Sequence, residues 1–346
     1  MALSPGFAVA AVGAGLGATP HFRAMEELRH AHALTWVCAR DAQRLQDRAL
    51  PAGARRTTRL EDILGDPLVR AVLVLTPPAA HLEVVRKLAQ AGKHVLVEKP
   101  LERDLPRARE LVACCESAGV VLAVMLQFRL RAGAVRLANL LRQGVLGSVT
   151  SASASVRWWR PQSYYDEPGR GTLARDGGGV LMTQAIHTLD LLLSLLGAPL
   201  RVTGAVSTSP LHRMETEDCA SALLHYPHGM VAVLQATTAA YPGSPERLEI
   251  NGTLGTATLE AGRLQLDFLD GRSEAAGADA GSGGGADPMA FGHSAHRTVL
   301  EDFLHAVETN TAPAISGRSA LLVHAVIEAI VESSRCGTPL PFDPSA

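Results

Sequence analysis

Lysine is rare in this chain, and one of its lysines lies where a titratable ammonium could take part in chemistry. Only three of the 32 lysine and arginine residues are lysines. Lys99 ends the run HVLVEK and precedes a proline that restricts the turn. The pKa of a lysine can be lowered by its surroundings, whereas an arginine stays protonated. We therefore expect Lys99 to be catalytic and Lys93 to be an ordinary surface residue.

A second motif, DGGGVLMTQAIHTLD at residues 176–190, combines a glycine-rich loop with polar residues at helical spacing. Thr183, His187 and Asp190 are spaced i, i+4 and i+7, which places them on one face of a helix. We expect His187 to accept a proton and Thr183 to orient substrate or water, both as catalytic residues, with Gln184 and Asp190 contacting substrate. The alternative is a core histidine that Asp190 binds for structure alone.

The turn after the first apolar run carries a glycine pattern that cradles phosphates. Gly13 allows a tight turn, Gly15 lets the backbone approach a pyrophosphate, and the small Ala18 lets the helix pack on the strand. The following helix N-terminus adds N–H donors and the positive end of its dipole. The pattern predicts dinucleotide binding through Gly13, Gly15, Leu16, Gly17 and Ala18. A plain glycine-rich turn is the alternative.

The end of the second apolar run favours NADP over NAD. Sites for NAD usually place an acidic residue there to bind the ribose 2′-hydroxyl, but this chain has Ala39, followed by Arg40. A guanidinium can pair with a 2′-phosphate, and the missing carboxylate removes its repulsion. If Asp41 reaches the ribose instead, the cofactor would be NAD.

Other apolar runs also end in residues suited to cofactor contacts. Thr76 and Pro77, with His81 just beyond, follow one run, and Glu98 and Lys99 end the next. Parallel strands that alternate with helices bind ligands at their carboxyl edge. We therefore expect these five residues to line the cofactor site.

Aromatic residues are concentrated just before the glycine-rich loop. The pairs at 158–159 and 164–165 are Trp-Trp and Tyr-Tyr, and Arg170 lies between them and the loop. Aromatic faces and guanidinium groups suit a sugar ring that carries an acid or phosphate, or a cyclic diol. The expected substrate contacts are Trp159, Tyr165 and Arg170, with about half of the four aromatics in the core or in a subunit interface.

The pattern of elements predicts an α/β fold in two parts. Up to residue 126, continuous apolar runs alternate with amphipathic segments, which is typical of a doubly wound parallel sheet of the Rossmann type. From residue 148, polar and apolar residues alternate as in antiparallel strands, with a helix near 179–196. We expect a nucleotide-binding domain at 1–126 and, at 127–346, a substrate-binding domain with an open, largely antiparallel sheet and a mobile glycine-rich loop at 277–288. The open sheet predicts a homodimer or homotetramer.

Composition narrows the class of protein. The chain has 346 residues, 47% of them hydrophobic, and a net charge of −2. The neutral balance argues against a nucleic-acid partner, and no run reaches the roughly 20 apolar residues of a membrane span. The five cysteines show no CxxC spacing, so we expect reduced thiols in the cytoplasm and no metal site.

Five segments together resemble the family of glucose-fructose oxidoreductase, inositol dehydrogenase and rhizopine-catabolism proteins, the Gfo/Idh/MocA family. The resemblance covers essentially the whole chain and rests on these segments: GAGLGATPH from Gly13, TPPAAH from Thr76, EKP from Glu98, GGGVLMTQAIHTLD from Gly177 and IEAIVESS from Ile327. It implies hydride transfer to or from a nicotinamide, with Lys99 and His187 as catalytic pair. It also implies cofactor and substrate contacts at Gln127 and Arg129, where an interdomain hinge is the alternative.

Two positions depart from the family pattern. Many members carry an aspartate where this chain has Thr183, so a three-member relay of lysine, aspartate and histidine is not carried over. The third fingerprint glycine is Ala18, which is small enough to be tolerated.

The sequence leaves three functions open. The first is an NAD(P)-dependent dehydrogenase or reductase of a sugar, cyclitol or related cyclic polyol. The others are a non-catalytic, nicotinamide-binding regulator and a nicotinamide-assisted glycosidase. Lys99 and His187 favour the first, since a regulator does not need them.

Overall fold

A computed structural model of the chain describes residues 6–277, 281, 284–285 and 292–343. Contacts divide the chain into two compact units. The first unit comprises Met1–Met125 and His293–Leu321, and the second comprises Leu126–Gly292 and Leu322–Ala346. Most of the glycine-rich segment 277–288 lies outside the described residues.

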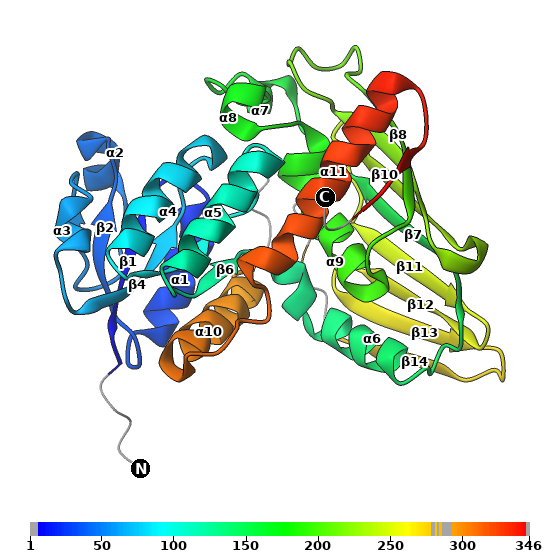
Figure 1. The fold of residues 1–346 in the computed structure, drawn as a ribbon, viewed down its shortest axis with the longest axis horizontal. Coiled ribbons are helices and arrows are strands. Elements are labelled where there is room, and N and C mark those ends of the chain that lie inside the picture. The colour runs from blue at the N-terminus through cyan, green and yellow to red at the C-terminus, as the bar shows by residue number, and fades with distance from the viewer. Residues whose placement is uncertain (1–5, 278–280, 282–283, 286–291, 344–346) are drawn as a thin grey trace. The chain divides into compact units, whose positions relative to one another are not determined.

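The first unit contains a parallel sheet. Among its described residues, six strands run in the order β3-β2-β1-β4-β5-β6 (Figure 1). The order reverses direction at β1, and right-handed crossovers then place helices on both faces. The central strands are almost fully buried, which explains their continuous apolar sequence. The strand bounds are β1 Ala8–Val12, β2 Leu34–Cys38, β3 Arg55–Thr57, β4 Val69–Val74, β5 His94–Val97 and β6 Leu122–Val124.

The helices of this unit include one from far along the chain. Helix α10 (Ser294–Thr309) packs against α1 (Ala18–Leu28) and β5. The segment 293–321 therefore belongs to the first compact unit, whereas the sequence placed all of 127–346 in the second domain. The other helices are α2 Ala42–Asp47, α3 Glu61–Leu64, η1 Pro78–Ala80, α4 His81–Gln90 and α5 Leu105–Ser117.

Lys93, expected at the surface, is buried in this unit. Its Nζ donates hydrogen bonds to the backbone carbonyls of Asp66 and Val69, both at 2.8 Å. Burial lowers its pKa despite the nearby charge of Asp66. Lys93 therefore holds the loop before β4, a structural role that its sequence neighbours do not reveal.

The second unit contains an open sheet. In its described part, nine strands follow the order β14-β13-β12-β11-β7-β10-β9-β8-β15, and β7 with β10 is the one parallel pair among them. The predicted fold class, a Rossmann sheet plus an open, largely antiparallel sheet, is confirmed. The bounds are β7 Val149–Arg157, β8 Arg201–Ser207, β9 Cys219–His225, β10 Val231–Thr237, β11 Arg247–Gly252, β12 Gly255–Glu260, β13 Arg263–Phe268, β14 Ser273–Ala276 and β15 Leu340–Pro341.

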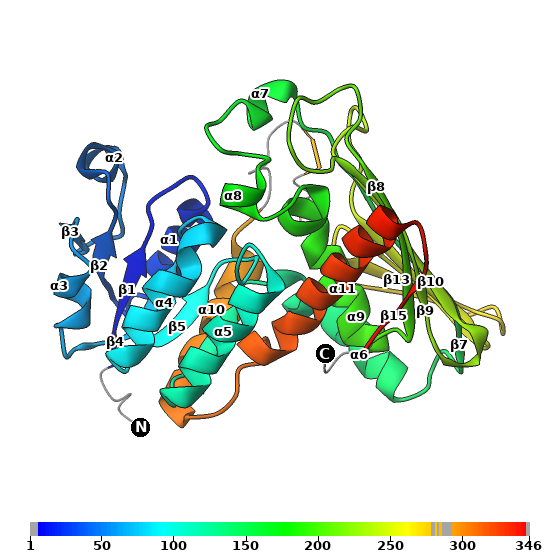
Figure 2. The same ribbon diagram turned by 45° about the horizontal axis from the view of Figure 1, so that its top comes forward.

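Helices cover one face of this sheet. Helices α6 (Ala132–Arg142) and α9 (Ile186–Leu196) pack on its strands, and α11 (Gly317–Cys336) crosses from the first unit to the second. Figure 2 shows α6 and α9 on the same side of the sheet. On the opposite face Leu223 and Val233, paired across β9 and β10, are 41% and 43% exposed.

Shorter elements complete the second unit. They are η2 Gln127–Leu130, α7 Gln162–Tyr165, α8 Leu173–Asp176, the π-helix η3 Leu181–Ala185 and η4 Pro227–Gly229. The segment Leu173–Leu196 is long and apolar enough to cross a membrane by composition, but most of it is buried inside the protein, as in a core helix.

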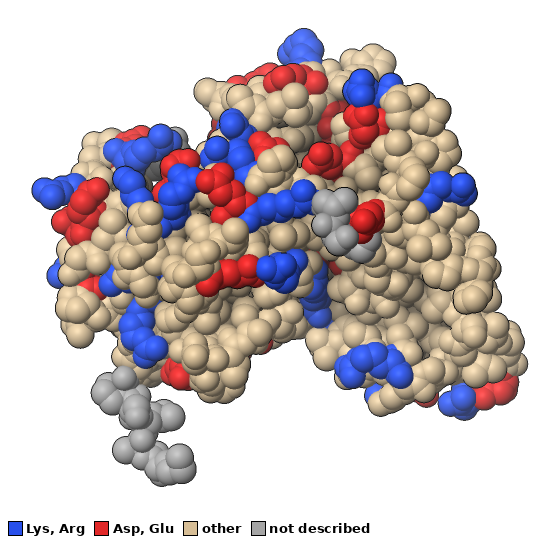
Figure 3. All heavy atoms as spheres, viewed as in Figure 1, with Lys and Arg blue, Asp and Glu red and all other residues tan. Residues whose placement is uncertain are grey.

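On the face shown in Figure 3, basic and acidic side chains are interspersed.

Candidate active site

The glycine turn after β1 has the geometry of a phosphate cradle. Gly13 has a φ of +114°, and a Cβ atom there would lie 2.5 Å from the carbonyl oxygen of Leu75. At Gly15 and Gly17, by contrast, a Cβ atom would meet no described atom within 4 Å. Gly13 is thus required by the fold, while the other two glycines leave open space before α1. Leu16 lies exposed between them.

The end of β2 carries the residues that would distinguish the two nicotinamide cofactors. The amide of Ala39 donates to the carbonyl of Thr57, 3.1 Å away, which fixes the chain between β2 and β3. Arg40 follows and is exposed, so its guanidinium is accessible to a ligand. Asp41 is exposed as well but has an interaction partner within the protein.

His81 connects two loops at the carboxyl edge of the parallel sheet. Its ring is completely buried, with Nε2 2.8 Å from the carbonyl oxygen of Thr76 and Nδ1 3.1 Å from that of Pro100. Burial lowers its pKa, although hydrogen bonds to the backbone act in the opposite direction. A fully buried ring does not contact a cofactor, so we assign His81 to holding the Thr76 and Lys99 loops together.

Glu98 is held from both sides. Its Oε1 lies 2.6 Å from Nε2 of His21, and its Oε2 accepts a hydrogen bond from the amide of Lys99 at 3.0 Å. Burial by itself raises the pKa of Glu98, but the hydrogen bond from His21 and the fields of His21, His296 and Lys99 outweigh it and hold the pKa at about 2. Glu98 therefore fixes the backbone that carries Lys99.

His296 completes a buried cluster that the sequence did not indicate. Its ring meets the edge of His21, with centroids 5.2 Å apart, and the cluster joins α1, β5 and α10. Two imidazoles and a carboxylate are also zinc-ligand types. However, the 2.6 Å contact between His21 and Glu98 is a hydrogen-bond distance and leaves no room for an ion between these two atoms.

The glycine-rich loop of the second unit is capped by a residue that sequence reasoning missed. The Glu217 carboxylate accepts hydrogen bonds from the amides of Gly179 (3.0 Å) and Leu181 (3.1 Å), and its own carbonyl accepts from Val180 (2.8 Å). Burial raises the pKa of Glu217, and these backbone donors reduce that shift. A Cβ atom on Gly179 would lie 1.7 Å from the Glu217 carbonyl oxygen, which accounts for the glycine.

The helix after this loop begins with a π-turn rather than a regular α-helix. Thr183 lies within η3, and its hydroxyl donates to the Gly179 carbonyl at 2.6 Å. A π-turn contains an additional residue, so residues before it are rotated about the axis relative to those after it. The face shared by Thr183, His187 and Asp190 in a regular helix is therefore altered.

His187 lies against the ring of Phe128, while Asp190 binds Arg129. The ring of His187, 6% exposed, stacks on Phe128 with centroids 4.9 Å apart. Asp190 instead accepts a bidentate pair of hydrogen bonds from Arg129, one of them 2.6 Å long. Burial raises the pKa of Asp190, partly offset by Arg129. Because Asp190 is completely buried, we reassign it from substrate contact to support of α9, where Arg129 binds it.

The two tyrosines before the glycine-rich loop have different environments. Tyr165 is buried and its hydroxyl lies 2.6 Å from Thr238 Oγ1, so the structure places it in the core instead of at substrate. Tyr164 is half-buried, and its hydroxyl accepts hydrogen bonds from Arg170 (2.8 Å) and Gln184 (3.4 Å). Tyr164 is therefore the better candidate for a surface that faces a ligand.

Trp159 and Gln127, both predicted ligand contacts, differ in how far they are buried. Trp159 is half-buried, with its ring edge-to-face on Tyr241 at 5.4 Å between centroids. Gln127 begins η2 and is 7% exposed. Lys99 belongs to the first compact unit and His187 to the second.

The fold and these motifs define the class of protein. A parallel sheet in the order 3-2-1-4-5-6 with a glycine turn after β1 is a dinucleotide-binding fold, and the chain is an NAD(P)-dependent oxidoreductase. Residues 7–126 match the model of the oxidoreductase family with an NAD-binding Rossmann fold, and residues 134–258 match the Gfo/Idh/MocA C-terminal domain. The chain belongs to the Gfo/Idh/MocA family.

Individual relatives agree with this assignment. An uncharacterized oxidoreductase of Synechocystis sp. is 30% identical over 78% of this chain and 76% of its own length. D-apiose dehydrogenase of Paraburkholderia graminis is 28% identical over 96% of this chain and 88% of its own length. A shorter match, to an uncharacterized oxidoreductase of Schizosaccharomyces pombe, is 30% identical and spans 58% of this chain and 55% of that protein.

A solved structure resembles the whole chain. The WlbA dehydrogenase of Bordetella pertussis, in complex with NADH and UDP-GlcNAcA, superposes with a TM-score of 0.83 and 27% sequence identity. The superposition covers 98% of this chain and 99% of that one.

Proposed function

We propose that the protein transfers a hydride between a nicotinamide and a hydroxyl or carbonyl carbon of a sugar, cyclitol or related polyol, with Lys99 and His187 as the catalytic pair. The observation that carries the proposal is the fixed position of Lys99 at the carboxyl end of β5, where Glu98 holds its amide. A bound nicotinamide would supply hydride acceptance or donation at its C4 atom. Each catalytic residue then has a separate task.

His187 serves as general base in the oxidative direction and removes the substrate hydroxyl proton. Lys99 donates a hydrogen bond to the same oxygen and keeps it aligned. In the reductive direction the roles reverse, so that His187 returns the proton to the forming alkoxide. Thr183 has no basic group, and its hydroxyl is bound to Gly179, so it orients the helix start.

We propose that the substrate is a neutral polyol and not a sugar acid or phosphate. Three guanidiniums of the second unit that could bind an anion are already engaged there. Arg170 donates to Glu167 at 2.9 Å, Arg129 pairs with Asp190, and Arg160 donates to the carbonyls of Trp159 and Gly285 at 2.8 and 2.6 Å. Similarity to D-apiose dehydrogenase supports a neutral sugar, while the WlbA complex holds UDP-GlcNAcA.

We propose NADP as the preferred cofactor, with NAD as the alternative. The exposed Arg40 and the absence of an acidic side chain at Ala39 support this preference. The WlbA dehydrogenase, a relative of this chain, was solved in complex with NADH. That complex supports NAD as the alternative cofactor.

A lysine substitution with a matched control tests the catalytic assignment. We expect Lys99→Met to lower kcat by a factor of about 10² to 10⁴, the usual contribution of acid–base groups, with little change in cofactor affinity. Lys87→Met, an exposed lysine on α4, is the control. The assay follows net NADPH or NADH formation with a panel of neutral polyols. Turnover retained in Lys99→Met would refute the assignment, and cofactor binding without any net reduction would favour a regulator or a glycosidase.

We propose that the exposed face of the nine-stranded sheet forms the interface of a homodimer or homotetramer. Leu223 and Val233 are exposed large apolar residues of that face, on the adjacent strands β9 and β10. Sedimentation of the protein and of Val233→Arg tests this interface. A wild-type monomer at micromolar concentration would contradict it.

A further inference from the structure

Phe128 lies between two ion pairs that fix the chain on either side of it. On one side Arg129 binds the buried Asp190 of α9. On the other, Arg131 binds Glu246 at 2.5 Å, with side chains only 12% and 6% exposed. All five residues belong to the second unit. The phenyl ring is 6% exposed and therefore has little freedom to move.

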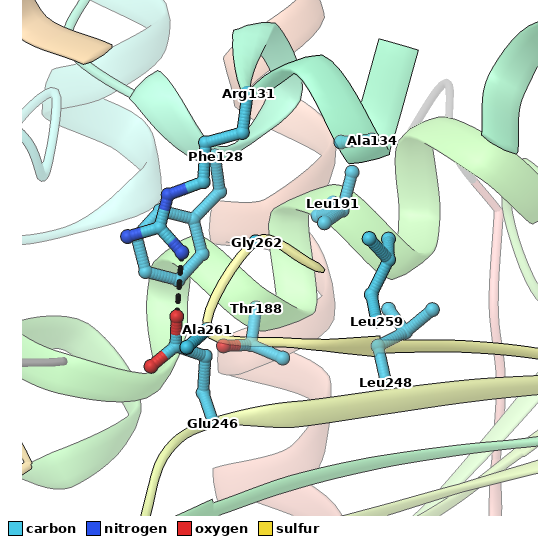
Figure 4. A pocket seen from close by; sticks show the side chains of 10 residues that line it. All are labelled: Phe128, Arg131, Ala134, Thr188, Leu191, Glu246, Leu248, Leu259, Ala261 and Gly262. Carbon is cyan, nitrogen blue, oxygen red and sulfur yellow. Dashed lines mark hydrogen bonds and ion pairs between the residues drawn. The ribbon is translucent and has the colours of Figure 1, made fainter. Parts of the chain in front are cut away.

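Arg131 also holds the ring directly. Its guanidinium carbon lies 3.5 Å from the centroid of Phe128, and Figure 4 shows the guanidinium over the ring and directed at Glu246. The surrounding pocket is otherwise lined largely by apolar side chains such as Leu248 and Leu259. A charged pair in such surroundings adds little net stability, because desolvation offsets the attraction. Its contribution is to hold one side-chain arrangement, which calls for a functional reason.

His187 supplies that reason. Its imidazole stacks on Phe128 at an angle of 26°. The terminal torsion of a histidine is broad, so helix position alone does not set the ring plane. A fixed aromatic face selects one ring plane, and the nitrogens then point in fixed directions. Proton transfer depends on such alignment, and a misplacement of about 1 Å can lower a rate by a factor of 10².

We propose that Phe128, Arg131 and Glu246 are positioning residues that fix the imidazole plane of His187. The inference rests on the proposed role of His187 as general base. Glu246 orients Arg131, Arg131 holds the Phe128 ring, and Phe128 supports the imidazole. None of these three side chains needs to touch substrate for this role.

Kinetics of matched variants test the proposal. We expect Phe128→Leu and Arg131→Met to lower kcat about tenfold, the upper range for loss of one aromatic contact, with the KM for substrate and cofactor changing less than about twofold. Phe128→Tyr keeps the stacked ring and should retain most of kcat. Arg131→Lys keeps the charge but not the planar guanidinium over the ring, so it should fall between the wild type and Arg131→Met. Arg136→Met, at an exposed arginine of the helix α6 that begins directly after Arg131, is the control for loss of a guanidinium.

Imidazole NMR of ¹⁵N-histidine-labelled protein gives a readout independent of turnover. The His187 resonances, identified by their loss in His187→Asn, should shift or broaden in Phe128→Leu and Arg131→Met and stay in place in Arg136→Met. If Phe128→Leu does not fold, Glu246→Gln, which keeps the side-chain volume, takes its place.

The outcomes separate the two hypotheses. Unchanged kcat in His187→Asn would refute the proposed general base but leave the NMR test of ring positioning intact. Loss of kcat in His187→Asn together with unchanged kcat or unchanged His187 resonances in both Phe128→Leu and Arg131→Met would overturn the positioning role.

Discussion

Alanine at two glycines of the phosphate turn should separate a requirement of the fold from a requirement of the ligand. Gly13 has a φ of +114°, and its Cβ would lie 2.5 Å from the Leu75 oxygen and 2.6 Å from the Leu75 carbon. These atoms are backbone at the end of β4 and cannot rotate away. Gly15 is two residues further along, with no described atom within 4 Å of its Cβ. The same added methyl group is thus tested in two environments.

The φ angle and the Cβ distances, combined with general energies for strain and overlap, set the expected size of both effects. At Gly13 the positive φ costs about 1–3 kcal/mol for a residue with a side chain, and the overlap with backbone adds about 1–3 kcal/mol. The sum, about 2–6 kcal/mol, is a large part of a typical unfolding free energy of about 5–15 kcal/mol. At Gly15 we expect a change within about 0.5 kcal/mol without cofactor, as for an exposed site. A methyl group that keeps the backbone from a pyrophosphate should weaken cofactor binding at least about tenfold, or 1.4 kcal/mol.

Two measurements decide between these outcomes. Urea denaturation of the cofactor-free protein gives the free energy of unfolding of each variant, and a fluorescence titration with NADPH or NADH gives the Kd. Gly13→Ala with wild-type stability would show that the turn geometry argument is wrong. Gly15→Ala with wild-type cofactor affinity would show that the open space beside Gly15 does not receive the pyrophosphate.

Three further predictions follow from single contacts. Glu217→Ala leaves two buried amides of the glycine-rich loop without their acceptor and should lower the free energy of unfolding by about 2–4 kcal/mol, measured with urea. Glu98 has its pKa lowered from 4.5 to about 2, so it stabilises the fold above pH 4.5 and this contribution, about 3 kcal/mol, is lost as the pH falls toward 2. Glu98→Gln should accordingly flatten the decline in stability across that window, and an unchanged decline would contradict the assignment. Arg40→Ser should weaken NADPH binding at least about tenfold and leave NADH binding nearly unchanged, as measured by fluorescence titration; equal losses for both cofactors would refute a 2′-phosphate contact.

The sequence was sufficient to predict the elements that neighbouring residues determine. Continuous apolar runs predict buried parallel strands, and β1, β4 and β5 are such strands. The glycine turn was predictable because Gly13 meets a steric demand set by its immediate fold. The placement of α10 was not, since its packing against α1 joins residues such as Glu27 and Arg297, which are 270 positions apart, and depends on complementary surfaces that no local pattern records.

The residues of the candidate site also differ in whether a local sequence pattern could predict them. Residues that we propose for the chemistry, Lys99 and His187, could be picked out from the sequence because such a reaction restricts their type. Residues that position them could not, because many side chains at many distances could do so. Glu217 caps the loop from 38 residues away, and Glu246 reaches Arg131 across 115 residues. The spacing of Thr183, His187 and Asp190 predicted one helix face, but a π-turn and the Arg129 pair changed both the geometry and the partner. A sequence can therefore indicate a candidate general base such as His187 before it can indicate the residues that orient its side chain. The Phe128 variants measure that orientation.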